Sequence, residues 1–120
     1  MLSRRHRYTR AHRLRGAAQF RRVYASPRRA SSAAADAAAA ENGGTLARLG
    51  IAIGKRNIPA VVVRNRLKRL TREQFRGQQA RLGGLDVVIT VRRQAAAMRK
   101  REFIAVVQKL FDRIASCEGF

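Results

Sequence analysis

Apolar residues recur along this chain at two spacings, and each spacing predicts one kind of element. Helical spacing, with an apolar residue every three or four positions, predicts helices from residue 17 to Pro27, over about 60–79 and over 99–117. Alternation over 46–54 and a strongly apolar run over 85–91 predict two strands. Taken in chain order, these elements predict an α+β fold built as a two-layer sandwich.

The same patterns indicate a core and an open surface. Five residues on one stripe of the last helix should be buried: Phe103, Val107, Leu110, Phe111 and Ile114. The strand over 46–54 directs Leu49, Ile51 and Ile53 to one face, whereas Gly50 and Gly54 on the other face carry no side chain. Another group could therefore approach the backbone closely on that second face.

Residues 31–40 form an alanine-rich run without a clear period and without bulky side chains. The alanines favour a helix or a loose loop over a strand by intrinsic propensity. The following residues 41–44, with sequence ENGG, indicate a turn. We expect at most a short or irregular edge strand in this segment.

Composition adds that the chain is strongly basic. Its 120 residues contain 27 Lys and Arg against 7 Asp and Glu, which gives a formal net charge of +20. Charge of this size repels itself in the folded state and attracts nucleic acid or an anionic membrane surface. No apolar run approaches the roughly 18 residues that span a bilayer, and the single Cys117 agrees with a reducing compartment. We therefore expect a soluble, cytoplasmic protein.

The helix over 60–79 separates its apolar and basic residues onto opposite faces. At about 100° per residue, one arc collects Val63, Leu67, Leu70 and Gln74, with Phe75 near its edge. The opposite arc collects Asn65, Lys68, Arg69, Arg72 and Arg76, with Arg64 and Arg66 on its flanks. Only Glu73 opposes this charge, whereas a solvated helix surface usually mixes signs and gains from ion pairs.

A face of this kind predicts binding to a nucleic acid, because phosphates would neutralise cations that otherwise destabilise the helix. The amide of Asn65 both donates and accepts hydrogen bonds, so it could reach a base edge, a 2′-hydroxyl or a metal-bound water. An ordinary exposed Asn without a special role is the alternative.

Four segments carry a resemblance to one family. Residues 48–56 (RLGIAIGKR) and 60–76 (AVVVRNRLKRLTREQFR) are similar to the signature of the bacterial ribonuclease P protein subunit. Residues 19–24 (QFRRVY) resemble the first helix of that family, and residues 86–92 (DVVITVR) resemble its last strand.

The resemblance implies a protein subunit that assists a catalytic RNA in removing the 5′ leader from precursor tRNA. Catalysis would belong to the RNA and its Mg²⁺ ions, so the chain would supply neither catalytic residues nor metal ligands. The family contacts its catalytic RNA through residues that correspond here to Arg64, Asn65, Arg66, Lys68, Arg69 and Arg72. Its leader-binding cleft corresponds to Phe20, Tyr24, Lys55 and Arg56, with Phe20 mainly in the core and Tyr24 the more exposed ring.

The resemblance also implies the architecture and the partners. The fold would be a four-stranded sheet with three helices and a left-handed crossover, like the second domain of a small-subunit ribosomal protein. A basic N-terminal arm over 1–7 and a C-terminal tail over 117–120 would flank a single domain over 8–116. The expected partners are the catalytic RNA and the precursor leader, with no membrane and no stable protein partner. One departure is the alanine-rich run, which replaces the family's bulky first strand and puts leader contacts from that strand in doubt.

Other basic proteins are the alternatives to this hypothesis. A self-sufficient nuclease would need carboxylates or a His pair aimed at a phosphate, whereas the acids here are scattered and both His lie near the N-terminus. A DNA-binding or nucleoid protein fits the strand, helix, strand order and the glycine-faced strand poorly. Only the specific motif match argues against a basic ribosomal protein.

Overall fold

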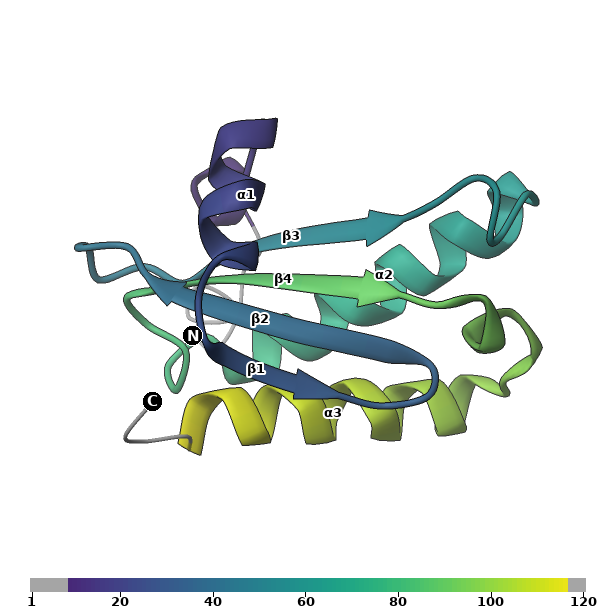
Figure 1. Cartoon of the computed structure of the whole chain (residues 1–120). Coiled ribbons are helices and arrows are strands. Elements are labelled where there is room, and N and C mark those ends of the chain that lie inside the picture. The colour runs from purple at the N-terminus through teal and green to yellow at the C-terminus, as the bar shows by residue number, and fades with distance from the viewer. Residues whose placement is uncertain (1–8, 117–120) are drawn as a thin grey trace.

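The computed structural model describes residues 9–116 and contains a four-stranded mixed sheet with three α-helices (Figure 1). The helices are α1 Ala17–Tyr24, α2 Val61–Gln78 and α3 Lys100–Ser116, and two short 3-10 helices span Arg10–His12 and Arg93–Ala97. The strands are β1 Arg28–Ser31, β2 Ala35–Glu41, β3 Arg48–Ile53 and β4 Leu85–Val91. The expected arm over 1–7, the tail over 117–120 and Cys117 lie outside the described residues.

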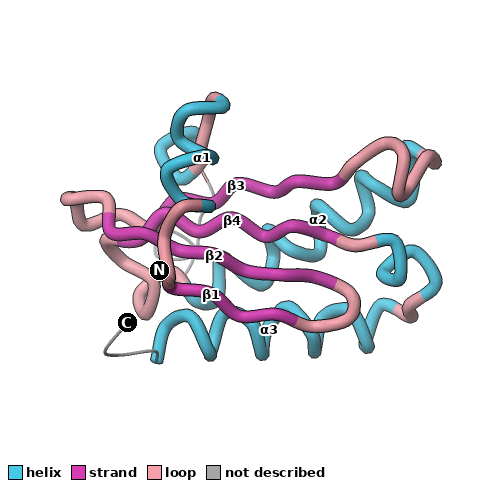
Figure 2. Tube along the Cα trace, in the orientation of Figure 1, coloured by secondary structure: helices cyan, strands magenta, loops and turns pink. Residues whose placement is uncertain are grey.

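The sheet has the strand order β1-β2-β4-β3. β2 pairs antiparallel with both β1 and β4, whereas β3 and β4 are parallel and are joined through α2. Helices α2 and α3 cover one face of this sheet, which we call the inner face, and α1 packs on the opposite, outer face at one end (Figure 2). The α+β fold predicted from the sequence is therefore confirmed.

The main core lies between the sheet and helices α2 and α3. Its largest fully buried side chains include Phe75, Phe103 and Phe111. All five residues predicted for the stripe of α3 are buried. On α2, Leu67, Leu70 and Phe75 are buried as well. A smaller cluster on the outer face joins Leu14 and Val23 to Ala38 and Val88.

Two details of α2 differ from the helical pattern. Thr71 is completely buried and donates its hydroxyl to the carbonyl of Leu67 at 2.8 Å, whereas Gln74 is only half-buried. The side-chain amide of Gln74 instead accepts a hydrogen bond from Gln108 of α3 at 2.8 Å. A hydroxyl that donates to the preceding turn can enter a core, so Thr71 is buried although the helical projection did not assign it, whereas Gln74, which the projection placed on the apolar arc, lies at the edge of the core.

The expectation for the alanine-rich run is wrong. Residues 35–41 form β2, an interior strand that pairs along its whole length with β4, and the edge strand is the short β1. Ala35, Ala37 and Ala39 are buried on the inner face, where α3 packs across β1 and β2. Small side chains suit a strand that a helix covers closely, and pairing with the apolar β4 outweighs their weak strand propensity.

Candidate nucleic-acid interface

Helix α1 lies on the outer face of the sheet above a position that has no side chain. A Cβ atom at residue 50 would lie only 2.5 Å from Cζ of Phe20. The ring of Phe20 thus occupies the space that the side chain of any residue other than glycine would need at this position of β3. The ring of Phe20 also lies near that of Tyr24 on the same helix, with centroids 6.3 Å apart. Both rings are half-buried and pack against the smaller core cluster.

A cleft of about 220 Å³ opens between α1 and the strands beside it. Six residues line it: Tyr24, Arg29, Asp36, Ala37, Ala38 and Thr90. The hydroxyl of Tyr24 lies 3.3 Å from Oγ1 of Thr90, which holds the aromatic ring at the wall. The cleft thus combines an aromatic side chain, a cation and a floor of small residues. Phe20 does not line this cleft, although its ring is half-buried to the same class as that of Tyr24.

One acidic side chain belongs to the same cleft. Oδ2 of Asp36 accepts hydrogen bonds from Nε and Nη2 of Arg92 at 3.0 and 2.7 Å, whereas Oδ1 has no hydrogen-bond partner within residues 9–116. Arg92 therefore neutralises Asp36, which is the only carboxylate among the described residues that line the cleft. The sequence did not single out this pair, because 56 positions separate the two residues.

Lys55 and Arg56 are exposed in the turn that follows β3. The structure does not bring them into the cleft beside Tyr24. Lys55 follows Gly50 by five residues, which corresponds to about 16 Å along an extended strand. The two cations thus lie at the end of the sheet opposite α1 (Figure 1).

Helix α2 presents its basic residues as the sequence predicted. Asn65 and Arg69 are exposed, and Arg66, Lys68 and Arg72 are half-buried. Arg69 pairs with Glu73 at 3.4 Å, whereas the other four make no side-chain hydrogen bond or ion pair within residues 9–116. No acidic residue lies in the first turn, where the helix dipole favours one. The helix therefore carries cations that the described part of the chain does not neutralise.

Arg64 differs from its neighbours. Its Nη1 donates to the backbone carbonyls of Ile58 and Pro59, both at 2.8 Å. These bonds tie the first turn of α2 to the loop that precedes the helix. Arg64 thus has a structural contact that the sequence pattern did not indicate.

A buried carboxylate connects α1 to the sheet. Asp86 in β4 is fully buried and accepts hydrogen bonds from Nε and Nη2 of Arg48, each at 2.7 Å, and from the amide of Asn42 at 3.0 Å. Arg22 of α1 also pairs with Asp86, and donates to the carbonyl of Glu41 at 3.0 Å. Burial opposes ionisation of Asp86, but these hydrogen bonds and the charges of Arg48 and Arg22 outweigh it and lower its pKa. We call Arg22, Asn42, Arg48 and Asp86 the Asp86 cluster.

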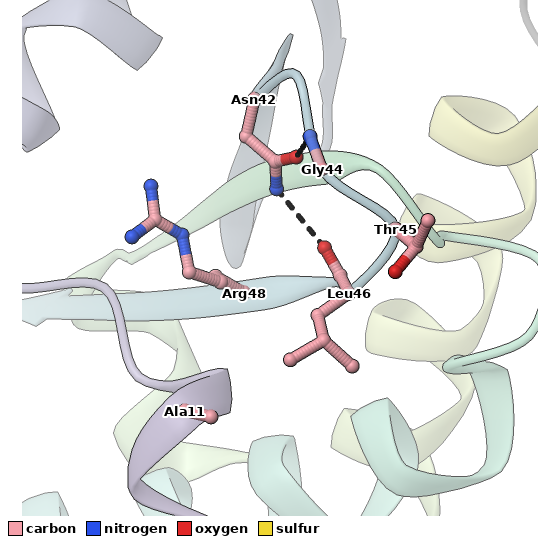
Figure 3. A pocket seen from close by; sticks show the side chains of 6 residues that line it. All are labelled: Ala11, Asn42, Gly44, Thr45, Leu46 and Arg48. Atoms are coloured by element: carbon pink, nitrogen blue, oxygen red, sulfur yellow. Dashed lines mark hydrogen bonds between the residues drawn. The ribbon is translucent and has the colours of Figure 1, made fainter.

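The cluster borders a pocket of about 380 Å³ at the turn between β2 and β3 (Figure 3). Asn42 spans this turn: its Nδ2 donates to the carbonyl of Leu46 at 3.0 Å, and its Oδ1 accepts from the backbone amide of Gly44 at 2.8 Å. Asn42 and Arg48 form two walls of the pocket and both bind Asp86. The conformation of this turn and the position of α1 therefore depend on the same carboxylate, because Asn42, Arg48 and Arg22 all bind Asp86.

The described part of the chain contains neither a metal-binding cluster nor a membrane-spanning helix. Within residues 9–116, no three His, Cys, Asp or Glu side chains come together in a way that could hold a metal ion. No helix in this part of the chain is long and apolar enough to cross a bilayer.

Comparisons with known proteins agree with the motif. Residues 8–115 match the family model described as Ribonuclease P. The ribonuclease P protein component of Chromobacterium violaceum is 34% identical over 114 residues, covering 95% of this chain and 94% of that protein. That of Methylococcus capsulatus is 35% identical over 102 residues, covering 85% and 80%. The solved ribonuclease P protein of Thermotoga maritima superposes with a TM-score of 0.71 at 26% identity, covering 89% of this chain and 98% of that one. The Staphylococcus aureus protein shares the fold with a TM-score of 0.78 at 23% identity, covering 86% and 94%.

The sheet with its covering helices, the unneutralised face of α2 and the cleft under α1 define a small α+β protein of the RNA-binding class. Within that class, the chain belongs to the ribonuclease P protein component family. It is thus a subunit of the ribonuclease P holoenzyme, which processes tRNA.

Proposed function

We propose that this chain assists the catalytic RNA of ribonuclease P in removing the 5′ leader from precursor tRNA, and that it broadens the range of precursors cleaved. The observation that carries the proposal is the outward face of α2, where Asn65, Arg66, Lys68 and Arg72 have no partner in the described chain. Phosphates of a folded RNA would neutralise these side chains. Arg69 extends this face, and Arg64 holds its first turn in place.

The leader occupies the outer face of the sheet in this proposal. An unpaired base stacks on Tyr24 at about 1 to 3 kcal/mol, independent of its identity, and Arg29 lies in the same cleft to meet a phosphate. Phe20 supports the cleft from the core side. Lys55 and Arg56 would contact phosphates further along the strand, because they lie at the other end of the sheet.

Chemistry belongs to the RNA in this proposal, and the chain works in the cytoplasm without a stable protein partner. The family implies Mg²⁺, but the described residues do not fit a site for it, because they bring no cluster of acids together. In this proposal the RNA binds Mg²⁺.

Reconstitution with a bacterial ribonuclease P RNA at low Mg²⁺ tests the proposal. The wild-type chain should stimulate cleavage of precursor tRNA. Arg66→Ala should weaken assembly of the holoenzyme, whereas Tyr24→Ala should mainly raise KM for a precursor that carries a leader. Lys109→Ala, an exposed cation on α3 outside both surfaces, serves as the control. Cleavage by the protein without RNA, or unchanged cleavage in both variants, would contradict the proposal.

A further inference from the structure

One oxygen of Asp36 stands out in the cleft beside Tyr24, because it is buried and has no hydrogen-bond partner. Among the side chains of residues 9–116, Oδ1 of Asp36 is the only buried nitrogen or oxygen atom of which this is true. A buried polar atom without a partner lowers the stability of the folded state, so its presence needs an explanation. The ion pair with Arg92 does not supply one, since both of its hydrogen bonds go to Oδ2.

Paired strands hold Asp36 beside the aromatic ring. Asp36 of β2 lies opposite Thr90 of β4 in the sheet register, and Oγ1 of Thr90 lies 3.3 Å from the hydroxyl of Tyr24. Arg92 is fixed as well, because its backbone N–H donates to the carbonyl of Ala34 at 2.8 Å. The carboxylate and the ring therefore keep their relative positions without help from a loop.

The free oxygen can act only as an acceptor. Arg92 occupies Oδ2, and an ionised carboxylate has no hydrogen to donate. The Asp36 side chain as a whole is 30% exposed, although Oδ1 itself is shielded from water. The terminal bond of an Asp side chain rotates easily, so Oδ1 can turn toward the cleft while Oδ2 keeps its contact with Arg92. A ligand in the cleft would thus meet one free acceptor next to an aromatic ring.

The charge of this cleft favours a base over a phosphate. Among the described residues that line it, Arg29 is the one cation and Asp36 the one carboxylate, so their charges cancel. A phosphate close to Asp36 would be repelled by the carboxylate. An unpaired base is neutral, can stack on Tyr24 and presents hydrogen-bonding groups along its edge.

We propose that Asp36 is a specificity-determining residue of the leader site, and that its Oδ1 accepts a hydrogen bond from the exocyclic amino group of a base stacked on Tyr24. The inference rests on the proposed function, because it names the class of base that the same cleft takes. Cytosine carries an amino group at the ring position where uracil, like thymine, carries a carbonyl oxygen. A carbonyl oxygen at this place would oppose one acceptor to another, so the site disfavours uridine.

Competition between two precursor tRNAs tests this inference. The precursors differ only in whether the leader consists of cytidines or uridines, and the reconstituted holoenzyme cleaves both in one reaction, so that the product ratio gives the ratio of kcat/KM. The wild type should prefer the cytidine leader about tenfold, in line with one hydrogen bond to a charged group. Asp36→Asn places an amide that can also donate to the uracil carbonyl, so the ratio should fall to about twofold or less. A folding defect would lower both values of kcat/KM equally and leave their ratio unchanged.

Asp112→Asn is the matched control, because Asp112 is exposed and pairs with Arg81 at 2.6 Å outside the cleft. It should keep the wild-type ratio. A wild type that does not discriminate or that prefers uridine, or an Asp36→Asn variant with the wild-type ratio, would overturn this inference and leave the proposed leader site intact. If Tyr24→Ala lowered the cleavage of neither precursor, the leader site itself would be wrong, and this inference with it.

Discussion

The ring of Phe20 occupies the space in which a side chain at residue 50 would begin, because a Cβ there would lie 2.5 Å from Cζ of the ring. Phe20 belongs to α1 and Gly50 to β3, so the missing side chain at residue 50 is what lets the ring of Phe20 approach the sheet this closely. The backbone of Gly50 has no positive φ, so the position needs glycine for space and not for backbone conformation.

Gly50→Ala should therefore displace α1. Overpacking of this kind costs about 1 to 3 kcal/mol of unfolding free energy, and the shift should also weaken binding of a single-stranded leader. Gly54→Ala is the matched control, since its Cβ would meet only the Asn57 side chain at an ordinary 3.5 Å. Chemical denaturation and leader-binding titrations of the two variants check this. Equal stability of both variants would contradict the steric argument.

Asp86→Asn should be destabilising. The substitution removes the charge that compensates Arg48 and Arg22 while leaving both cations in place. Because both cations are partly exposed to water, the loss of their hydrogen bonds to a buried acceptor should cost about 1 to 3 kcal/mol of unfolding free energy. Because Arg22 provides the ion pair between α1 and the sheet, amide hydrogen exchange should accelerate in α1 more than in α3. Uniform acceleration throughout the protein would show that the cluster has no special role in seating α1.

The pH dependence of stability should reveal the same carboxylate. The pKa of Asp86 is lowered below its ordinary 3.8, so its stabilising effect is fully present above that value and is lost as pH falls through the lowered pKa. The stability difference between wild type and Asp86→Asn should thus be constant at neutral pH and shrink below about pH 4. Denaturant unfolding curves from pH 7 to pH 2 measure it. A difference that begins to shrink near pH 6 would indicate another group.

The spacing of apolar residues along the chain correctly predicted those elements whose buried face can be recognised from their own residues alone. The stripe of α3 and the cationic face of α2 are examples, because a helix determines which of its residues share a face. Strand β2 was mispredicted because its stability comes from pairing with β1 and β4, which no local pattern of alanines shows. The Asp86 cluster was missed for the same reason, since Asp86 lies 64 positions from Arg22 and 38 from Arg48.

The relative positions of the residues proposed to bind the leader could not be predicted from the sequence either. The family resemblance named Tyr24 and Lys55 together, but the register of β3 separates them along the sheet. Thr90 and Asp36, which line the cleft with Tyr24, come from the central strands. Alternation in β4 puts Thr90 on the same face as Asp86, which is a signal that could have indicated it once the face under α1 was known.

Substitutions at Tyr24 should separate the ring from its hydroxyl. Tyr24→Phe keeps the aromatic surface and loses only the contact to Thr90 at 3.3 Å, so leader affinity should fall about threefold or less. Tyr24→Leu removes the aromatic ring and should cost about 1 to 3 kcal/mol of leader binding. Fluorescence titration of a labelled leader oligonucleotide with the holoenzyme measures both. Equal losses in the two variants would indicate that the hydroxyl contact, and not stacking, governs binding.

The unneutralised charge predicts that small anions stabilise the free protein. A formal net charge of +20 destabilises the folded state, and an anion that binds only this state stabilises it by mass action. At ten times its Kd, sulfate would add about 1.4 kcal/mol, which corresponds to a rise of several degrees in melting temperature. Thermal melts should use sulfate at low millimolar concentration, where its general salting-out effect is small, against sodium chloride at equal ionic strength. Equal melting temperatures in the two salts would show that screening alone relieves the repulsion and that the chain does not bind single anions at its cationic surfaces.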